Sequence, residues 1–173
     1  MKKIILSTLL GLVYILTGCL PKKNGLDGYK DIKFDMSLEQ VKDITKNQKN
    51  FKVEDGYVKD CISIRYDTEI IDSPANVSVN FCDKDKTVIN MINVSMYSLA
   101  DSDMWNKVAS MIKVKYPQAT ETPISKEETG YGSLIIEQSF MFADGSSINM
   151  LSIQGTTFYS HISYKPRPKN LGL

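Results

Sequence analysis

Two cysteines lie in two segments of this chain that have the pattern of paired strands. Residues 60–67 and residues 76–82 each alternate apolar and polar side chains, and Cys61 and Cys82 both fall on the polar side of the alternation. A period of two is typical of strands with one buried face. If the segments pair antiparallel with Cys61 opposite Cys82, three apolar pairs also face each other. These pairs are Ile62 with Phe81, Ile64 with Val79, and Tyr66 with Val77.

A single strand register therefore places the two cysteines within reach of a disulfide and also puts the apolar side chains on one shared face. A shift by one residue would turn every side chain of one strand to the opposite face of the sheet. Cross-strand apolar pairs stabilise an antiparallel sheet. The pair of cysteines thus constrains the fold more than any other feature, provided that a bridge forms between them.

The first eighteen residues have the layout of a secretory signal peptide. Lys2 and Lys3 precede an apolar run from Ile4 to Leu16, and the small residues Thr17-Gly18 follow it. The run is thirteen residues long, whereas a helix needs about 20 residues to span the hydrocarbon core of a bilayer. We therefore expect residues 1–18 to be removed rather than to remain as a transmembrane helix.

The residues Leu16-Thr17-Gly18-Cys19 resemble a bacterial lipobox, in which a large aliphatic residue, a small residue and Gly or Ala precede an invariant Cys. The resemblance implies that the Cys19 thiol receives a diacylglycerol and that the signal is cut before Cys19. It also implies that the new α-amino group is often acylated. One acyl chain holds a protein only marginally, whereas two or three anchor it firmly. The alternative is an ordinary signal peptide with an unrelated cysteine.

The resemblance also predicts a location. In enteric bacteria, Asp after the lipidated Cys favours retention in the inner membrane, and here that residue is Leu20. We expect a lipid anchor in the cell envelope, and in a Gram-negative host we favour the outer membrane, facing the periplasm, over the inner membrane.

With Cys19 assigned to lipid, Cys61 and Cys82 remain as a pair in an exported domain. Export to an oxidising compartment makes a disulfide the default. A reactive or metal-binding pair is the alternative, but the chain has no CxxC spacing and its one histidine, His161, lies far along the sequence. We expect a disulfide and neither a metal nor a cofactor.

The rest of the chain divides into a tether, a domain and a tail. Residues 19–31 contain Pro, Gly and charges without periodicity, which predicts a short tether. Residues 32–165 carry the periodic segments of an envelope domain. Residues 166–173 are Pro-rich and basic, and we expect them to be extended and exposed.

Helix caps and alternation predict the elements of the domain. Ser37 and Gln40 form a capping box, and Asp101 to Asp103 can cap a second helix that Pro117 ends. The predicted elements are a helix at about 37–47, strands at about 60–67, 76–82 and 87–97, a helix from 101–103 to about 115, and strands at about 133–142, 147–154 and 157–165.

A helix followed by three strands therefore occurs twice. This order predicts an α+β fold of two helix-plus-three-stranded antiparallel meander units in a single compact domain, with possible halves at 32–97 and 101–165. Their sequence identity is negligible, so a duplication is a hypothesis from element order alone. In the second half, a three-residue loop at Asp144–Ser146 predicts two facing pairs. These are Phe142 with Ile148 and Phe140 with Met150.

The segment Ile32–Val41, with the sequence IKFDMSLEQV, is similar to the "G-M-s-x-x-x-V" helix start of the β-lactamase-inhibitor-protein-like fold. The same pattern occurs in the small lipoprotein subunit of the outer-membrane β-barrel assembly machine. The resemblance covers about ten residues, and Asp35 stands where the pattern usually has Gly. It implies a domain that binds other proteins and is not an enzyme.

Charge and motifs exclude several classes of function. Removal of residues 1–18 takes away two lysines and no acids, so the formal charge changes from +1 to −1 and gives no electrostatic argument for nucleic acid. No GxSxG, HExxH, P-loop or EF-hand spacing occurs. We therefore expect no catalytic residue and no enzyme activity.

The residues that could carry chemistry have plainer interpretations. By the alternation of its strand, His161 falls on the face opposite the apolar residues, as a surface or edge residue would. In the turn at residues 83–86, the positive charges of Lys84 and Lys86 nearly cancel the negative charges of the two aspartates that could bind a cation. Nothing fixes the loop glutamates as an acid and a base at the separation that hydrolysis needs. The acids considered are Asp83, Asp85, Glu121, Glu127 and Glu128.

Two loops favour recognition of a partner. Ile70 and Ile71 lie between the two cysteine-bearing strands, where apolar residues are unexpected, and they would form a contact patch if exposed. The alternative is that they tuck under the sheet. Tyr131 lies between Gly130 and Gly132 in a loop whose aromatic tip could anchor a partner, or which is a plain loop.

The predicted function is a non-enzymatic envelope lipoprotein that binds a protein partner, as an accessory or assembly factor. An inhibitor or immunity protein against a toxin or hydrolase is the main alternative. A cell-wall hydrolase is a third class, and it would depend on Glu127 or Glu128.

Overall fold

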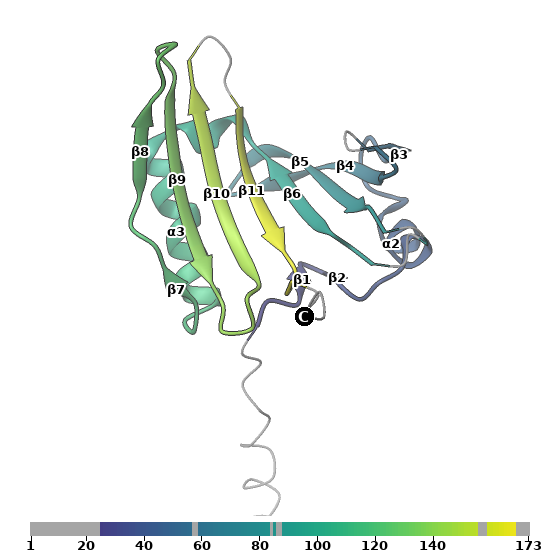
Figure 1. Cartoon of the computed structure of the whole chain (residues 1–173). Coiled ribbons are helices and arrows are strands. Elements are labelled where there is room, and N and C mark those ends of the chain that lie inside the picture. The colour runs from purple at the N-terminus through teal and green to yellow at the C-terminus, as the bar shows by residue number, and fades with distance from the viewer. Residues whose placement is uncertain (1–24, 57–58, 84, 86–87, 156–158, 169–173) are drawn as a thin grey trace, which may run out of the picture.

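The computed structural model describes residues 25–56, 59–83, 85, 88–155 and 159–168 (Figure 1). The predicted signal peptide, the Cys19 lipid site and residues 169–173 of the predicted tail lie outside the described residues. No helix within the described ranges is both long enough and apolar enough to cross a membrane.

In the described part of the chain, nine strands form one antiparallel sheet (Figure 1). The sheet has a central seam where β6 pairs with β11, and both β7 and β8 pair with the outer strand β9. In spatial order the strands are β3 (Lys52–Asp55), β4 (Ile62–Ile70), β5 (Ser73–Phe81), β6 (Met91–Ser95), β11 (Tyr159–Lys165), β10 (Ser147–Gln154), β9 (Leu134–Met141), β7 (Thr120–Glu121) and, also on β9, β8 (Ser125–Glu128).

The prediction of two α+β meander units is wrong. The described part of the chain is mostly β-sheet, with 44% of the described residues in strands and 19% in helices. The strands of both predicted halves, 32–97 and 101–165, join in a single sheet through pairs such as Val94 with Ile162. Separate units would have left the backbone groups of β6 and β11 unpaired along one edge each. Joining them satisfies both edges and merges the two apolar faces.

The helices begin where the sequence predicts. α2 (Leu38–Thr45) has the capping box, in which Ser37 Oγ accepts the Gln40 N–H at 3.3 Å and Gln40 Oε1 accepts the Ser37 N–H at 2.8 Å. At the start of α3 (Ser102–Lys115), the Asp101 carboxylate accepts two backbone N–H groups at 2.8 and 3.1 Å. A short 3-10 helix, η1 (Tyr97–Ala100), connects β6 to α3.

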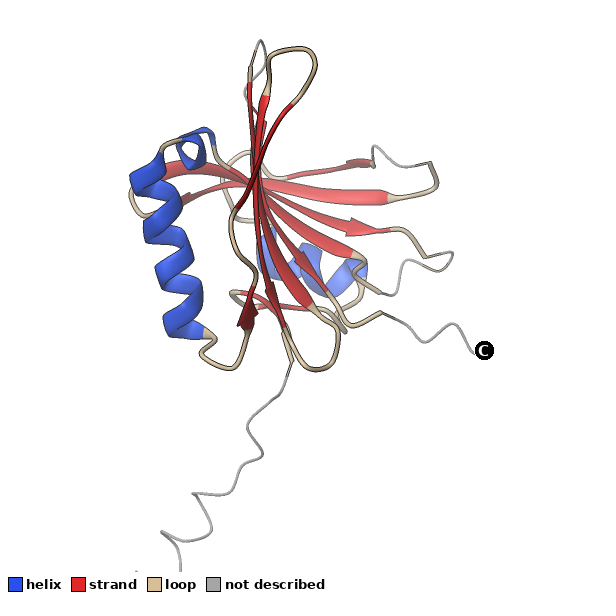
Figure 2. Cartoon of the chain, turned by 60° about the vertical axis from the view of Figure 1, so that its left-hand side comes forward, coloured by secondary structure: helices blue, strands red, loops and turns tan. Residues whose placement is uncertain are grey.

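Both helices contribute to one core on the same face of the sheet (Figure 2). Val41 of α2 and Val108 of α3 are buried in it, together with the inward side chains of the central strands. The largest fully buried of these include Phe81, Ile92, Phe140, Ile148, Met150 and Ile162. The opposite face carries the polar residues of the alternation.

The packed domain also includes part of the segment expected to be a tether. Gly28–Tyr29 (β1) and Ile32–Lys33 (β2) form a small hairpin, and Leu26 and Tyr29 are buried in the core. The Leu26 N–H donates to Ser146 Oγ at 2.9 Å, which holds the start of the described chain against the loop between β9 and β10. The packed region therefore starts before residue 32.

The predicted register of the cysteine-bearing strands is confirmed. β4 and β5 pair with Ile62 opposite Phe81, Ile64 opposite Val79 and Tyr66 opposite Val77. Cys61 and Cys82 form a disulfide, with their Cα atoms 4.1 Å apart, at the open end of this hairpin.

The predicted register of the β9–β10 hairpin is wrong by two residues. Phe140 faces Ile148, and the loop runs over residues 143–145, because the Phe142 N–H donates to Ser146 O and the Gly145 N–H donates to Phe142 O, both at 3.0 Å. The loop has three residues as predicted, but it begins one residue earlier. This places Gly145, with φ of 83°, at the left-handed position that such loops require. A shift of two residues keeps every side chain on its predicted face.

Candidate functional site

The turn between β4 and β5 holds Ile71 in a strained conformation. Ile71 and Asp72 have φ angles of 50° and 57°, so the two-residue turn between Ile70 and Ser73 is left-handed at both positions. Such a turn matches the twist of a hairpin and normally takes Asn or Gly. A β-branched residue with positive φ is an outlier that costs on the order of 1 kcal/mol or more. The turn therefore places a β-branched residue in a backbone conformation that such residues disfavour.

An apolar groove of about 280 Å³ is lined by Ile70 and Ile71 at the β4–β5 turn and by Val108, Met111 and Ile112 of α3. Both isoleucines are half-buried and pack against the core. Met111 is 54% exposed. The two isoleucines are thus neither an open patch nor fully tucked under the sheet. We call this feature the apolar groove.

Charged groups lie at the border of the apolar groove. Lys30, Lys115 and Glu69 contribute to its lining. The Lys30 ammonium donates to Thr68 Oγ1 at 3.1 Å and lies 5.5 Å from the centre of the Tyr29 ring. The Lys115 ammonium lies 5.2 Å from the centre of the Tyr116 ring. Two cations and one acid therefore surround apolar walls.

Buried tyrosines keep the inner part of the apolar groove neutral. Tyr29 and Tyr164 line it, with their ring centres 5.0 Å apart. Burial raises the pKa of both phenols well above the usual value of 10, and the neighbouring tyrosines raise it further. The Tyr29 hydroxyl is buried without a hydrogen-bond partner among the described residues.

Tyr131 lies at the tip of the β8–β9 hairpin and is 97% exposed. The Thr129 N–H donates to Ser133 O at 2.8 Å, the Gly132 N–H donates to Thr129 O at 3.0 Å, and Gly132 has a φ of 74°. This is the same three-residue loop geometry as in the β9–β10 hairpin. Tyr131 is not part of the apolar groove, so the structure does not bring the three predicted contact residues together.

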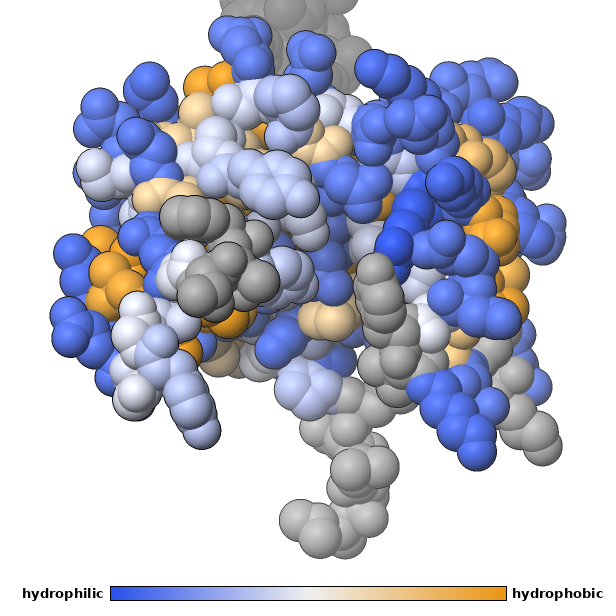
Figure 3. Space-filling view, turned by 90° about the horizontal axis from the view of Figure 1, so that it is seen from above, coloured by the Kyte–Doolittle hydropathy of each residue, from blue (hydrophilic) through white to orange (hydrophobic). Residues whose placement is uncertain are grey.

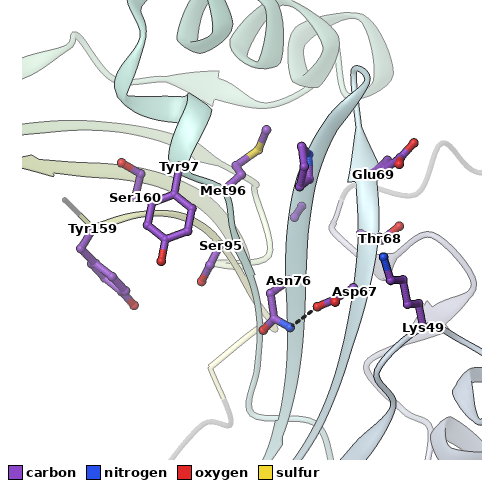
Figure 4. Close-up of a pocket in the computed structure, with 12 residues that line it drawn as sticks. Lys49, Asp67, Thr68, Glu69, Asn76, Ser95, Met96, Tyr97, Tyr159 and Ser160 are labelled. Carbon is purple, nitrogen blue, oxygen red and sulfur yellow. Dashed lines mark hydrogen bonds between the residues drawn. The ribbon is translucent and has the colours of Figure 1, made fainter.

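A larger groove, of about 830 Å³, lies where the end of β4 and the start of β5 meet the end of β6 and the start of β11 (Figure 4). Asp67, Asn76 and Ser95 line it on the strands, and Tyr97 and Tyr159 stand at its side. Sequence reasoning missed this polar groove, because its members come from four strands and one 3-10 helix and share no local motif.

The Asp67 carboxylate in the polar groove accepts two side-chain hydrogen bonds. Asn76 Nδ2 donates to Asp67 Oδ1 at 3.0 Å, and the Asn50 amide donates to Oδ2. The hydrogen bond from Asn76 is the first cause that lowers the pKa of the Asp67 carboxyl, followed by the one from Asn50. The carboxylate is therefore ionised at neutral pH, with one amide fixing each oxygen.

The residues considered for catalysis do not converge. Glu121 accepts a hydrogen bond from Gln138 and pairs with Lys113 at 2.7 Å, which ties β7 to β9 and α3. Glu127 and Glu128 are exposed neighbours on β8, so their side chains leave opposite faces of the strand. Asp83 Oδ1 accepts the Val88 N–H at 3.1 Å.

His161 lies on β11 between Ser95 and Leu151, which face it on the neighbouring strands. Its ring lies tilted against the Tyr159 ring, with ring centres 4.9 Å apart. Burial, followed by Lys165, lowers the pKa of His161, so the imidazole is neutral at neutral pH. Across the described ranges, no three His, Cys, Asp or Glu side chains are grouped as metal ligands would be.

Both grooves lie on the same domain, but the sequence predictions name only residues of the first. Comparison of this chain with protein-family models, with curated proteins and with solved structures found no match.

Proposed function

We propose that this chain is a lipid-anchored protein of the cell envelope that binds another protein through the apolar groove and catalyses no reaction. The observation that carries the proposal is the strained turn that places Ile71 in the same groove as Met111 of α3. An apolar groove with half-buried walls gives a partner's apolar side chains a place to leave water.

The size and border of the apolar groove indicate the partner's chemistry. Its volume of about 280 Å³ is at the lower limit of pockets that enclose small molecules. A few apolar side chains of a protein segment fit it better than a complete cofactor. Lys30 and Lys115 at the border favour a segment with acidic residues beside its apolar anchors.

Met111 is the most informative position for a test of this contact. We expect Met111→Asp to weaken binding by about 2 kcal/mol or more, roughly 30-fold in Kd, because it places a charge in a desolvated apolar contact. The matched control is Val114→Asp on the same helix, which changes an 83% exposed residue outside the groove and should leave binding unchanged.

The measurement is site-specific photocrosslinking of the full-length chain in membranes of its native host. A crosslinker at position 111 should give one defined adduct, a crosslinker at position 114 should give none, and Ile71→Asp should abolish the adduct from position 111. Equal labelling from both positions, or no adduct at all, would contradict the proposal. The identity of the adduct separates the two binding functions, since an inhibitor or immunity protein would capture a toxin or hydrolase.

The anchor is tested separately at Cys19. Cys19→Ser should abolish labelling of the chain by radioactive fatty acid and leave an uncut precursor, because the thiol is the proposed acceptor of the lipid. The control is the Cys82→Ser variant, which should be labelled and processed normally. Lipid labelling that persists in Cys19→Ser would remove the anchor from the proposal.

A further inference from the structure

An ordered row of side chains crosses four neighbouring strands, and its first three members lie in the polar groove. Asp67 of β4 faces Asn76 of β5, Asn76 faces Ser95 of β6, and Ser95 faces His161 of β11. Neighbouring strands are about 4.8 Å apart, so this row is about 14 Å long. Its first three members line the polar groove with a carboxylate, an amide and a hydroxyl, whereas His161 is not among the lining residues.

Aromatic side chains lie along one side of the row. Tyr97, on the 3-10 helix η1, is 83% exposed, and Tyr159 is half exposed beside His161. Figure 4 shows both rings on the Ser95 side of the groove, across from Asp67 and Asn76. The open space between them thus has aromatic rings on one side and hydrogen-bonding groups on the other.

We propose that the polar groove binds a short neutral saccharide. Sugar rings combine vicinal hydroxyls, which pair with carboxylate, amide and hydroxyl groups, with a flat face of C–H groups that stacks on an aromatic ring. Asp67 is pre-ordered for this task by Asn76 and Asn50. In Figure 4 the Asn76 amide oxygen lies on the side away from Asp67, toward Ser95 and the open groove.

Other ligand classes fit the polar groove less well. An extended peptide cannot pair with β5 or β6 here, because β5 is paired with both β4 and β6, and β6 with both β5 and β11. A polyanion would need several cations, whereas Lys49 is accompanied by Asp67 and Glu69 in the lining. The balance of charges favours an uncharged ligand that is recognised by hydrogen bonds and stacking.

The position of the polar groove suits a ligand away from the anchor. The described chain starts beside the loop between β9 and β10, at the lower end of the molecule in Figure 1. β11 begins at the opposite end, where Tyr159 lies. Figure 3 views the molecule from that end, and there the most hydrophobic residues lie mainly near the left and right borders of the surface. The saccharide site does not depend on the proposed protein contact.

The test is a titration of the purified full-length chain, in detergent, with a panel of neutral oligosaccharides that includes chitotriose, maltotriose and cellotriose. Isothermal calorimetry should detect saturable binding of at least one of them. Tyr97→Ala should weaken that binding about tenfold through the loss of one stacking contact. The matched control is Tyr131→Ala, which removes another highly exposed tyrosine, from the β8–β9 hairpin outside the polar groove, and should leave the affinity unchanged.

Two results would overturn the proposal. One is the absence of binding to every neutral saccharide of the panel, including the case in which an acidic glycan or a peptide library occupies the groove instead. The other is binding that Tyr97→Ala and Tyr131→Ala weaken equally. Met111→Asp should leave saccharide binding intact, so failure at the apolar groove and failure at the polar groove are separate outcomes.

Discussion

Removal of the Cys61–Cys82 disulfide is expected to lower the free energy of unfolding by about 3 kcal/mol. The two cysteines are 21 residues apart, and a cross-link over a loop of this size restricts the unfolded chain by about that amount in the chain-entropy treatment. For a domain of about 150 residues, the same loss lowers the melting temperature by roughly 10 °C. The folded hairpin should survive, because its strands are held by nine facing pairs.

The measurement is urea unfolding of the oxidised chain and of the double variant Cys61→Ala, Cys82→Ala, each with and without a strong reductant. Reductant should lower the unfolding midpoint of the natural chain and leave that of the double variant unchanged. Intact mass under non-reducing conditions should show the natural chain two hydrogens lighter than its reduced form. Equal midpoints for the natural chain and the double variant would contradict the prediction.

The same hairpin shows what the sequence can predict. Alternation and two cysteines were sufficient for the register of β4 and β5, because a slip by one residue would have exposed Ile64 and buried its polar neighbours. Helix starts were predictable for a similarly local reason, since Ser37 and Asp101 satisfy backbone N–H groups within three residues of themselves. Constraints of this kind involve residues close together in the sequence and can therefore be recognised from it.

The joining of the two halves was not predictable from such local patterns. The paired residues Asn93 of β6 and Ser163 of β11 are 70 positions apart in the chain. No sequence feature of either segment indicates that the other is its partner strand. β3 and β8 were missed for another reason, because their side chains are mostly exposed and show no apolar alternation. Edge strands are defined by the strand that they pair with rather than by their own burial.

For the candidate sites too, features with a local sequence pattern were predictable, and features that depend on long-range pairing were not. Ile70 and Ile71 could be singled out because apolar residues in a turn are locally unusual, but their partner Met111 belongs to a helix predicted for its own periodicity. The polar groove had no local signal at all. Its aligned residues Asp67, Asn76 and Ser95 come together only through the pairing of β4, β5 and β6.

A rise in pH above about 10 is expected to destabilise the fold steeply through three buried tyrosines. Tyr29, Tyr66 and Tyr164 are all less than 10% exposed. Burial, and secondarily the charge of Asp31, raises the pKa of Tyr66 to about 12, and burial raises the pKa of Tyr29 and Tyr164 further still. In the unfolded chain each phenol loses its proton near pH 10.

The direction of the effect follows from which state holds the protons. Below about pH 10 both states are protonated, and the stability that these tyrosines provide is fully present. Above it the unfolded chain releases protons that the folded chain retains, so the free energy of unfolding falls by about 1.4 kcal/mol per pH unit for each tyrosine. Together the three give a slope on the order of 4 kcal/mol per pH unit between about pH 10 and the folded pKa values.

Tyr29→Phe tests this origin of the slope, because the Tyr29 hydroxyl has no hydrogen-bond partner among the described residues. The variant should be as stable as the natural chain at neutral pH, or more stable, since it removes a buried unsatisfied group. Its slope above pH 10 should be about one third smaller. The measurement is urea unfolding at a series of pH values, with the absorbance of tyrosinate followed in parallel and Tyr131→Phe as the exposed control. Tyrosinate that forms well before unfolding, or a slope that Tyr29→Phe and Tyr131→Phe leave equally unchanged, would show that the buried cluster does not hold its protons in the folded state.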